Sequence, residues 1–310
     1  MKLKVVGTLA YDSITSEFGS KKNIFGGSAA YFALSSSYLS KRVSITGAIG
    51  NDFNLKDLEM LSSRGINVDG VEKMELKTFR WEGKYETNSP NDAITLSNSI
   101  IKGEDNVLNS YKPKLFHANE NIEEEYCLFL ANSDPKNQHE LLNQMDKKAK
   151  LIGLDTMDFW INNSPQLVKS LFPKIDVLVI NENEAKLITN ENTLRNCIEQ
   201  IQKLGAKRMV IKLGNYGLVY ASETTRFFLP AVLVGQVKDP TGAGDSFAGG
   251  FMGYLSTVEN LKEKDFKEAC ISGSVMASFS VEEFGLNRLL NLTKEDIINR
   301  KELLINQIKY

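Results

Sequence analysis

The chain contains few cysteines and has almost no net charge. Its three cysteines, Cys127, Cys197 and Cys270, lie far apart and none stands in a CxxC motif, which argues against a disulfide framework and a paired-thiol metal site. The 37 basic and 39 acidic residues give a net charge of −2, so the chain lacks the basic excess of proteins that bind nucleic acids or anionic membranes. No apolar run approaches the length of a bilayer span, and the first run is short and reaches an acid at Asp12, so we expect a first strand there rather than a signal peptide. We therefore expect a cytoplasmic protein with no nucleic-acid or membrane partner.

Short runs rich in β-branched residues alternate with helical patterns along the 310 residues. The runs suit strands buried on both faces of a parallel sheet, and they cover residues 3–7, 42–50, 151–155, 177–181 and 208–214. The patterns between them predict helices over 28–40, 55–65, 164–172 and 192–205. Gly65 and Gly205 stand where a glycine caps a helix C-terminus. The alternation predicts an α/β fold with a mostly parallel sheet, and the length favours a single domain over residues 1–310.

Two segments break this alternation. Residues 75–103 show short alternating runs around the turn signal NSPND, which indicates two or three antiparallel strands with no covering helix. Residues 11–23 have the pattern of another short pair of strands. Together they predict a small sheet that stands off the main domain.

The stretch DPTGAGDSFAGGFMGY, residues 239–254, has five glycines in its last thirteen residues. The run before it, residues 227–239, predicts a strand region that ends at Asp239. Apolar residues from Phe247 to Leu255 recur on one face of a helix. The TGAG segment is therefore expected to be the loop at a helix N-terminus, where free amides and the helix dipole form an anion site. Asp245 would present a carboxylate there, suited to take a proton from a hydroxyl that attacks phosphorus.

A helix that is merely capped by an acid is the alternative explanation of this stretch. It explains Gly249, Gly250 and Gly253 as packing glycines but does not require the dense TGAGD start. A P-loop motif is absent, and both histidines precede Ser246, which is the wrong chain order for the G-x-S-x-G hydrolases. The first strand is followed by GTLAYD rather than G-x-G-x-x-G, which argues against a dinucleotide-binding oxidoreductase.

Four motifs, in order along the chain, resemble those of the ribokinase-like, or PfkB, family of carbohydrate and nucleoside kinases. DPTGAGDSFAGGF (239–251) is similar to its C-terminal signature, and FGGSAAYFA (25–33) with GAIGNDF (47–53) to its N-terminal signature. NENEA (181–185) is similar to its N-x-x-E motif, and VIKLGNYG (210–217) to its strand and loop with two glycines.

The resemblance implies a ribokinase-like fold, a three-layer α/β/α core with a mostly parallel twisted sheet and a small β-sheet lid. The lid would be formed by about 11–23 and 75–113, inserted in the core. The resemblance also implies transfer of the γ-phosphoryl group of ATP to a hydroxyl of a sugar or nucleoside, with Mg²⁺. Such a transfer needs positioning and charge stabilisation more than covalent chemistry. Some members hold a monovalent cation such as K⁺, which would lie here at Asp239 and Thr241.

Roles follow from the resemblance position by position. Asp245 would be the catalytic base, and the amides of Gly242, Ala243 and Gly244 would form the anion hole for the transferred phosphoryl group. Two further groups are implied on either side of this centre. The nucleotide side would have Asn181 and Glu184, acting through Mg²⁺ and its waters, together with Lys212, Gly214 and Gly217. The substrate side would have Asp12 and the glycine pair Gly26 and Gly27.

The substrate side departs from the family pattern at Tyr31. Many sugar-specific members have an asparagine there that binds the sugar, and a phenol loses the donor–acceptor pattern of an amide. We expect Tyr31 in the substrate site, with Arg80 of the lid reaching a phosphate or a substrate oxygen. Phe79, Trp81 and Tyr85 have two explanations, stacking on a sugar or base and packing within the lid or a dimer contact.

Two functions remain open at this point. One is an ATP-dependent kinase for a sugar or nucleoside, and the other is a non-catalytic ligand-binding sensor (pseudokinase) on the same scaffold. The residues that catalysis would need are all present, which favours the kinase. Tyr31 and the lid aromatics favour a nucleoside or a larger sugar over free ribose. Exposed edges of a lid sheet favour pairing with a second lid, so we expect a homodimer.

Overall fold

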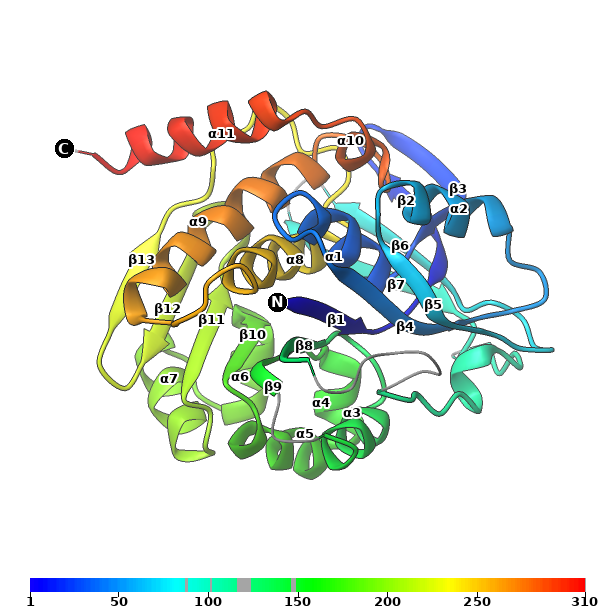
Figure 1. The fold of residues 1–310 in the computed structure, drawn as a ribbon, viewed down its shortest axis with the longest axis horizontal. Coiled ribbons are helices and arrows are strands. Elements are labelled where there is room, and N and C mark those ends of the chain that lie inside the picture. The colour runs from blue at the N-terminus through cyan, green and yellow to red at the C-terminus, as the bar shows by residue number, and fades with distance from the viewer. Residues whose placement is uncertain (87–88, 101, 116–123, 146–148, 310) are drawn as a thin grey trace.

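The computed structural model describes residues 1–86, 89–100, 102–115, 124–145 and 149–309, with the backbone alone in residues 89–92 (Figure 1). The described strands form two sheets. The larger sheet comprises β1 (Lys2–Val6), β4 (Val43–Ile49), β5 (Asn67–Lys73), β8 (Tyr126–Leu130), β9 (Ala149–Leu154), β10 (Val177–Asn181), β11 (Arg208–Lys212), β12 (Leu218–Ser222) and β13 (Arg226–Leu229). The α-helices are α1 (Ser28–Ser37), α2 (Leu55–Ser63), α3 (Pro135–Asn143), α4 (Asp158–Asn163), α5 (Pro165–Leu171), α6 (Glu182–Thr189), α7 (Leu194–Lys203), α8 (Ala243–Leu255), α9 (Glu263–Ser280), α10 (Asn287–Leu290) and α11 (Lys294–Gln307).

The larger sheet has the strand order β13-β12-β11-β10-β9-β8-β1-β4-β5. It is parallel from β11 across to β5, and β12 and β13 each run antiparallel to the strand before. The five strands predicted from the apolar runs are confirmed as β1, β4, β9, β10 and β11. The glycines predicted to end two helices are confirmed as well, because Gly65 and Gly205 have φ of 77° and 105°, a region that favours glycine.

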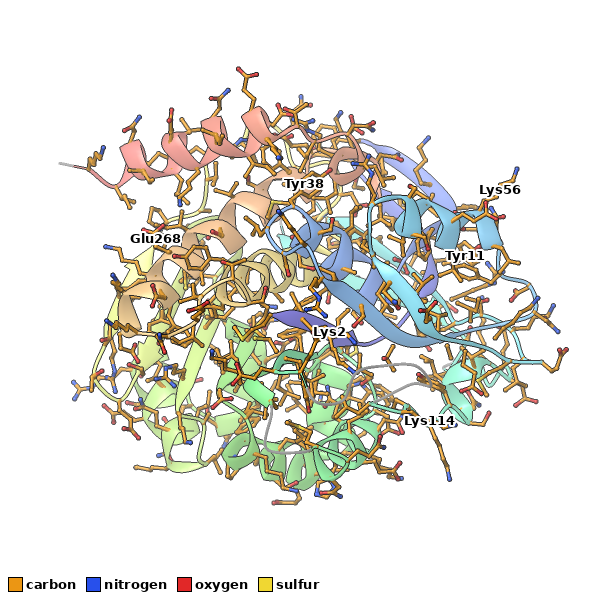
Figure 2. The ribbon with its side chains drawn as sticks, viewed as in Figure 1. Lys2, Tyr11, Tyr38, Lys56, Lys114 and Glu268 are labelled. Carbon is orange, nitrogen blue, oxygen red and sulfur yellow. The ribbon has the colours of Figure 1, made fainter. Side chains whose placement is uncertain are left out.

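Helices cover both faces of this sheet (Figure 1). On one face α1, α8 and α9 pack over a core that includes Phe32, Phe129 and Phe251, and on the other face α3 to α7 enclose a second core. Side chains also join helices on the same side of the sheet, as where the hydroxyl of Tyr38, at the end of α1, donates to the carbonyl oxygen of Leu289 in α10 at 2.5 Å (Figure 2). The expected three-layer α/β/α architecture is confirmed. Among the described helices, none is both long and apolar enough to cross a membrane.

Three glycines let α8 pack closely between its neighbours. A Cβ on Gly249 would lie 2.3 Å from the carbonyl oxygen of Phe32 in α1, and a Cβ on Gly250 would lie 2.8 Å from that of Ser272 in α9. A Cβ on Gly253 would lie 3.1 Å from Cα of Ser36. These approaches leave no room for a larger residue at the first two sites, which confirms the packing explanation.

The smaller sheet, with the order β3-β2-β6-β7, is built from the two segments that break the alternation. Its strands are β2 (Ala10–Ser16), β3 (Gly19–Gly26), β6 (Arg80–Glu86) and β7 (Ser89–Asn98). The hairpins β2–β3 and β6–β7 are antiparallel and are joined by the parallel pair β2–β6. Between residues 102 and 113 the described chain has the short 3₁₀ turn Val107–Asn109 rather than a strand, and residues 87–88 and 101 of the expected lid lie outside the described residues.

The predicted strand region ending at Asp239 is wrong. Strand β13 ends at Leu229, and residues 230–242 form an irregular segment with turns before α8. Pro230 follows the strand directly, and a proline cannot donate to the next hydrogen bond of a ladder.

Candidate active site

Three polar side chains stand at one edge of the larger sheet. Asp155 follows β9, Asn181 ends β10 and Lys212 ends β11, and these three strands are neighbours. Ligands of open α/β sheets bind beyond the carboxyl ends of parallel strands, which is this edge. The start of α8 lies there too, because a Cβ on Gly244 would be 2.8 Å from Nζ of Lys212.

The start of α8 offers free backbone amides. Gly242, the N-cap, has φ of 74° and makes no side-chain cap. The Ala243 amide donates to the carbonyl oxygen of Pro240 at 3.1 Å, whereas the amides of Gly242 and Gly244 find no backbone acceptor among the described residues. Two open amides at the positive end of a helix dipole form an anion site. Of the three amides expected there, Ala243 is thus the one already engaged.

Asp245 lies in the first turn of α8, beside these amides. Burial raises the pKa of Asp245 to about 7, and Asp155 adds to the rise while Lys212 opposes it. A carboxylate with a pKa near neutrality is matched to general-base catalysis at physiological pH.

Lys212 lies among three carboxylates. Its Nζ is 3.9 Å from Oδ1 of Asp155, and Glu184 and Asp245 also act on its charge. Burial alone would lower the pKa of Lys212, but the three carboxylates together raise it. Lys212 therefore stays protonated, and its ammonium lies against the start of α8.

Asn181 and Glu184 begin α6 as a capping box. Oδ1 of Asn181 accepts from the amide of Glu184 at 2.8 Å, and Oε2 of Glu184 accepts from the amide of Asn181 at 2.8 Å. Glu184 is only 7% exposed, so it is not the solvated glutamate that a helix start usually has. Burial raises its pKa to about 8, Lys212 lowers it and Asp155 raises it further. The pair thus has a structural role and also leaves a buried carboxylate beside Lys212.

Gly214 and Gly217 shape the loop after β11. Their φ angles are 59° and 105°, and the Gly217 amide donates to the carbonyl oxygen of Gly214 at 3.1 Å. A Cβ on Gly217 would lie 2.0 Å from the carbonyl oxygen of Leu229. Close backbone packing therefore explains Gly217 without a ligand.

Asp12 faces this centre from the smaller sheet. It is 5% exposed on β2, and a Cβ on Gly26 would lie 2.2 Å from its Oδ2. Burial raises the pKa of Asp12 to about 7, repulsion from Asp239 and Asp245 raises it further, and the amide of Gly27 opposes the rise. The structure thus brings Asp12 and the glycine pair into the electrostatic range of Asp245.

Tyr31 fills the space between the smaller sheet and the start of α8. Its ring lies 2.4 Å from the position of a Cβ on Gly242 and 3.2 Å from that of a Cβ on Gly26. Tyr31 is 1% exposed, and its hydroxyl has no hydrogen-bond partner in the described part of the chain. A buried polar group without a partner is costly, so this hydroxyl is a position where a ligand atom would be stabilising.

Asp239 ties the loop before α8 to the rest of the core. It is fully buried, and its two oxygens accept from the amides of Thr241 at 2.9 Å and Gly285 at 2.8 Å. The hydroxyls of Thr241 and Tyr85 are 3.0 Å apart, so the lid strand β6 is linked to this loop. The amides of Thr241 and Gly285 satisfy both carboxylate oxygens of Asp239. A monovalent cation at Asp239 and Thr241 stays a prediction.

Arg80 lies on the other face of the smaller sheet. In the parallel pairing of β2 and β6 it stands beside Tyr11, whereas Asp12 stands beside Trp81, and neighbours along a strand point to opposite faces. The guanidinium donates to Oδ2 of Asp52 at 2.8 Å and to Asn23 at 2.7 Å.

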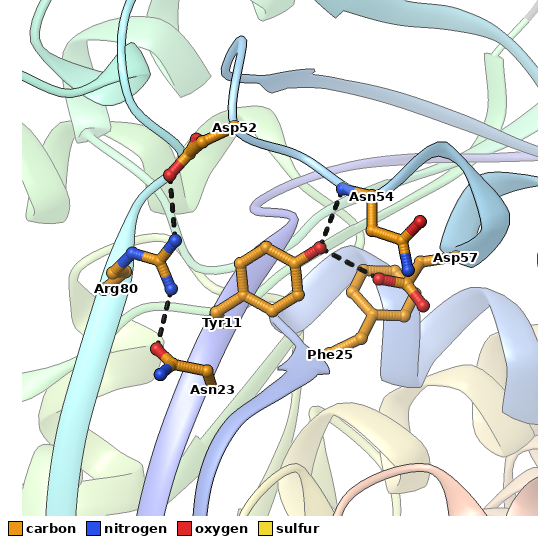
Figure 3. A pocket seen from close by; sticks show the side chains of 7 residues that line it. All are labelled: Tyr11, Asn23, Phe25, Asp52, Asn54, Asp57 and Arg80. Carbon is orange, nitrogen blue, oxygen red and sulfur yellow. Dashed lines mark hydrogen bonds and ion pairs between the residues drawn. The ribbon is translucent and has the colours of Figure 1, made fainter.

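A polar cavity of about 630 Å³ surrounds Arg80 (Figure 3). The Arg80 guanidinium lies over the Tyr11 ring, and the Tyr11 hydroxyl donates to Asp57 and accepts from the Asn54 amide. The Arg80 guanidinium and the Tyr11 hydroxyl therefore already have partners within the cavity, and the cavity does not include Asp245. The structure does not bring Arg80 together with the other expected site residues.

The residues at the carboxyl ends of β9, β10 and β11 fit ATP with Mg²⁺. Mg²⁺ favours oxygen ligands and is usually bound by one or two carboxylates with waters and phosphates rather than by an all-protein cage. Asp155 and Glu184 supply such carboxylates, and no cluster of three or more His, Cys, Asp or Glu able to hold a metal occurs among the described residues. The open amides of Gly242 and Gly244 fit a phosphate.

Asp155 is the residue of this group to which sequence reasoning gave no role. It is 6% exposed, and burial raises its pKa against the opposing charge of Lys212. The signal was available, because Asp155 ends a buried apolar run in the same way as Asn181 ends the next.

The chain is similar to known kinases over most of its length. The model of the pfkB family carbohydrate kinases matches residues 4–292. The chain is 27% identical to a cytidine kinase of Thermococcus kodakarensis over 85% of this chain and 91% of the relative. It is 26% identical to an ATP-dependent 6-phosphofructokinase of Thermoanaerobacterium thermosaccharolyticum over 83% of this chain and 82% of the relative.

A solved structure extends the likeness to the fold. Aminoimidazole riboside kinase from Salmonella enterica, complexed with aminoimidazole riboside and an ATP analogue, superimposes with a TM-score of 0.77 at 16% identity, over 97% of this chain and 100% of that chain. The expected ribokinase-like fold, with a large mostly parallel sheet and a small separate sheet, is thereby confirmed. The chain belongs to the pfkB family of carbohydrate kinases.

Proposed function

We propose that this ATP-dependent sugar or nucleoside kinase uses Asp245 as its catalytic base and the start of α8 as its anion hole. The observation that carries the proposal is the placement of the Asp245 carboxylate beside the open amides of Gly242 and Gly244. A base and an anion site side by side are what transfer of a phosphoryl group to a hydroxyl requires.

In the proposed step Asp245 takes the proton of the acceptor hydroxyl as that oxygen attacks the γ-phosphorus of ATP. The new oxygen–phosphorus bond forms while the bond from the γ-phosphorus to the bridging oxygen breaks, and ADP keeps that electron pair. The amides of Gly242 and Gly244 donate to the oxygens of the transferred phosphoryl group. The Ala243 amide can do so only if its hydrogen bond to the carbonyl oxygen of Pro240 breaks. Bound Mg²⁺ would neutralise charge that develops on the phosphates.

Other residues position and balance charge. Lys212, with Nζ against Gly244, would offset negative charge at the transferring group. Asp155 and Glu184, with Asn181 orienting Glu184, would hold Mg²⁺ directly or through water. Asp12, Gly26, Gly27 and Tyr31 would contact the acceptor.

The acceptor class is a sugar or a nucleoside, since relatives named for both match most of the chain. No observation in the described residues favours the sensor alternative, because no residue needed for the step is missing.

Asp245→Asn tests the base directly. We expect kcat to fall at least 100-fold, because an amide cannot accept the proton and general-base catalysis contributes about that much or more. ATP binding, measured by thermal shift, is expected to persist. The matched control is Asp265→Asn, since Asp265 occupies the same first-turn position of α9, remote from the site, and caps Lys262. The control should cost about 1 kcal/mol of stability at most and leave kcat unchanged. If Asp245→Asn keeps more than about a tenth of wild-type kcat, the base assignment is wrong.

A further inference from the structure

The turn that follows α9, residues 281–285, holds the segment that leads to α8. The carbonyl oxygen of Val281 accepts from the amides of Lys238 at 2.8 Å and Asp239 at 3.3 Å. The Gly285 amide donates to Oδ2 of Asp239 at 2.8 Å. Because Asp239 lies shortly before the N-cap of α8, the position of this α9 turn determines where the free amides of α8 begin.

Glu282 ties the α9 turn to the two helices at the end of the chain, which pack on α9 (Figure 1). Its Oε1 accepts from Nη2 of Arg300 in α11 at 2.7 Å, and its Oε2 accepts from Nε of Arg288 in α10 at 2.9 Å. Nη1 of Arg300 also donates to the hydroxyl of Ser278, in the last turn of α9, at 3.1 Å. Each carboxylate oxygen thus has its own guanidinium, and such charge-assisted hydrogen bonds are among the strong ones.

Phe279 lies against both guanidinium groups. The Arg300 guanidinium is 4.1 Å from the centroid of the Phe279 ring, and that of Arg288 is 5.1 Å from it. The Phe279 side chain is buried, and the side chain of Arg300 is 17% exposed. A guanidinium held by a carboxylate, a hydroxyl and an aromatic ring has little freedom to turn. Arg300 therefore fixes Glu282, and with it the α9 turn, in one position.

The lid contacts the same segment from the other side. The Ser16 hydroxyl of β2 donates to the carbonyl oxygen of Lys238 at 2.7 Å, and the hydroxyls of Tyr85 and Thr241 are 3.0 Å apart. A lid that opens to admit an acceptor gives up such contacts. Among the described residues, the contacts with the α9 turn belong to the core, so they can hold the segment while the lid moves.

From these contacts, and resting on the proposed anion hole, we infer that Arg300 is a positioning residue for phosphoryl transfer. It acts through Glu282 and the α9 turn, which place the segment 238–241 and the free amides at the start of α8. These amides are needed most when charge develops on the transferring group, so loss of Arg300 slows the chemical step more than it weakens ATP binding. A displacement of about 1 Å that starts far from the reacting atoms can lower a rate about 100-fold.

Arg300→Met and Lys301→Met are a matched pair of variants. Both replace a basic residue of α11 with methionine and both break an ion pair, since Nζ of Lys301 lies 3.0 Å from Oε2 of Glu268 in α9. Only Arg300 is bonded to the α9 turn. Methionine keeps an apolar side chain against Phe279 and so limits the loss of packing.

Kinetics provide the first measurement. Purified protein with ATP and Mg²⁺ is assayed for ADP release with cytidine, ribose and fructose 6-phosphate as acceptors. With each acceptor that the wild type uses, we expect Arg300→Met to lower kcat by about 10-fold or more. Its KM for ATP should stay within about twofold of wild type, because the lost interaction acts in the transition state. Lys301→Met should leave both constants within about twofold.

Amide hydrogen exchange separates positioning from a general loss of structure. Without ligand, the amides of Lys238 and Asp239 should exchange faster in Arg300→Met, whereas β10 should keep its wild-type protection. Glu282→Gln should reproduce the kinetic and the exchange effects, and it replaces Arg300→Met if that variant does not fold. The double variant should be no more impaired than the worse single variant, because the two residues act as one unit.

The two proposals fail in different ways. A smaller loss of kcat in Arg300→Met, an equal loss in Lys301→Met, or unchanged exchange at Lys238 and Asp239 overturns the inference and leaves the proposed function intact. Faster exchange throughout the chain, β10 included, overturns it as well. No turnover of any acceptor by the wild type contradicts the proposed function instead, and the exchange measurement alone then decides whether Arg300 holds the segment.

Discussion

Replacing Asp12 with asparagine should stabilise the unliganded protein at neutral and alkaline pH. Asp12 is nearly fully buried, and its pKa is raised from 3.8 to about 7 by burial and by repulsion from Asp239 and Asp245. One pKa unit corresponds to about 1.4 kcal/mol, so ionised Asp12 destabilises the fold by about 4 kcal/mol, as an upper value. Asparagine has nearly the same shape, and its oxygen can still accept from the Gly27 amide.

The sign follows from the folded and unfolded pKa values. Below pH 4 Asp12 is protonated in both states and contributes no difference. Between about pH 4 and pH 7 the folded state holds a proton that the unfolded state has released, so stability falls as pH rises. Above pH 7 the loss is complete. The advantage of Asp12→Asn over wild type should therefore grow from near zero at pH 4 to its full value at pH 8.

Urea unfolding at pH 5, 6, 7 and 8, without ligand, measures this advantage. Relaxation of the site will reduce it, and we expect about 2 kcal/mol at pH 8 with a positive slope across the range. Glu59→Gln, at an exposed position of α2, is the control and should stay within about 0.5 kcal/mol at every pH. A variant equally or less stable than wild type at pH 8, or an advantage that does not vary with pH, would refute the electrostatic argument.

Three other changes test neighbouring parts of the structure. Lys212→Met removes the cation that lowers the pKa of Asp245. The acidic limb of the kcat–pH profile should therefore move to higher pH by about one unit. If this limb does not move, Lys212 does not act on Asp245 as described. Gly242→Ala should lower kcat at least 10-fold, because the φ of Gly242 is 74° and the new methyl group would meet the Tyr31 ring. Gly253→Ala should reduce thermal stability but leave kcat unchanged. If both variants lose kcat equally, the assignment of Gly242 to the site and of Gly253 to packing is wrong. Sedimentation at micromolar concentration should show a dimer through the lid, and a single species of 34.7 kDa would exclude it.

Five strands of the larger sheet, β1, β4, β9, β10 and β11, were predicted because each carries its own signal, whereas β5, β8 and β12 were not among the runs that the sequence analysis identified. Buried parallel strands such as β10 need apolar side chains on both faces, and β10 accordingly has a continuous apolar run of four residues, 177–180, before Asn181. The start of α8 was predictable for the same reason, since the glycines and Asp245 are adjacent in the chain. Strand β13 shows the limit: apolar residues continue to Val237, and only Pro230 signals that pairing stops.

The contents of the site were less predictable because they depend on contacts between distant segments. Lys212 reaches Asp155 and the start of α8 only once β9 and β11 flank β10. Arg80 is paired with Asp52 because of which face of β6 it occupies, and a strand of uncertain register does not reveal that face. The unpaired Tyr31 hydroxyl is likewise a property of the packed interior.

The smaller sheet closes over the candidate active site in this structure, and this affects the order in which the acceptor binds and reacts. Tyr31 and Asp239 are buried and the hydroxyls of Tyr85 and Thr241 lie within hydrogen-bonding distance, so the smaller sheet rests on the loop that leads to Asp245. We expect an acceptor to reach Asp12 when this contact opens, and we expect the contact to form again once the acceptor is bound. Closure excludes water from Asp245, and in a kinase this prevents transfer of the phosphoryl group to water.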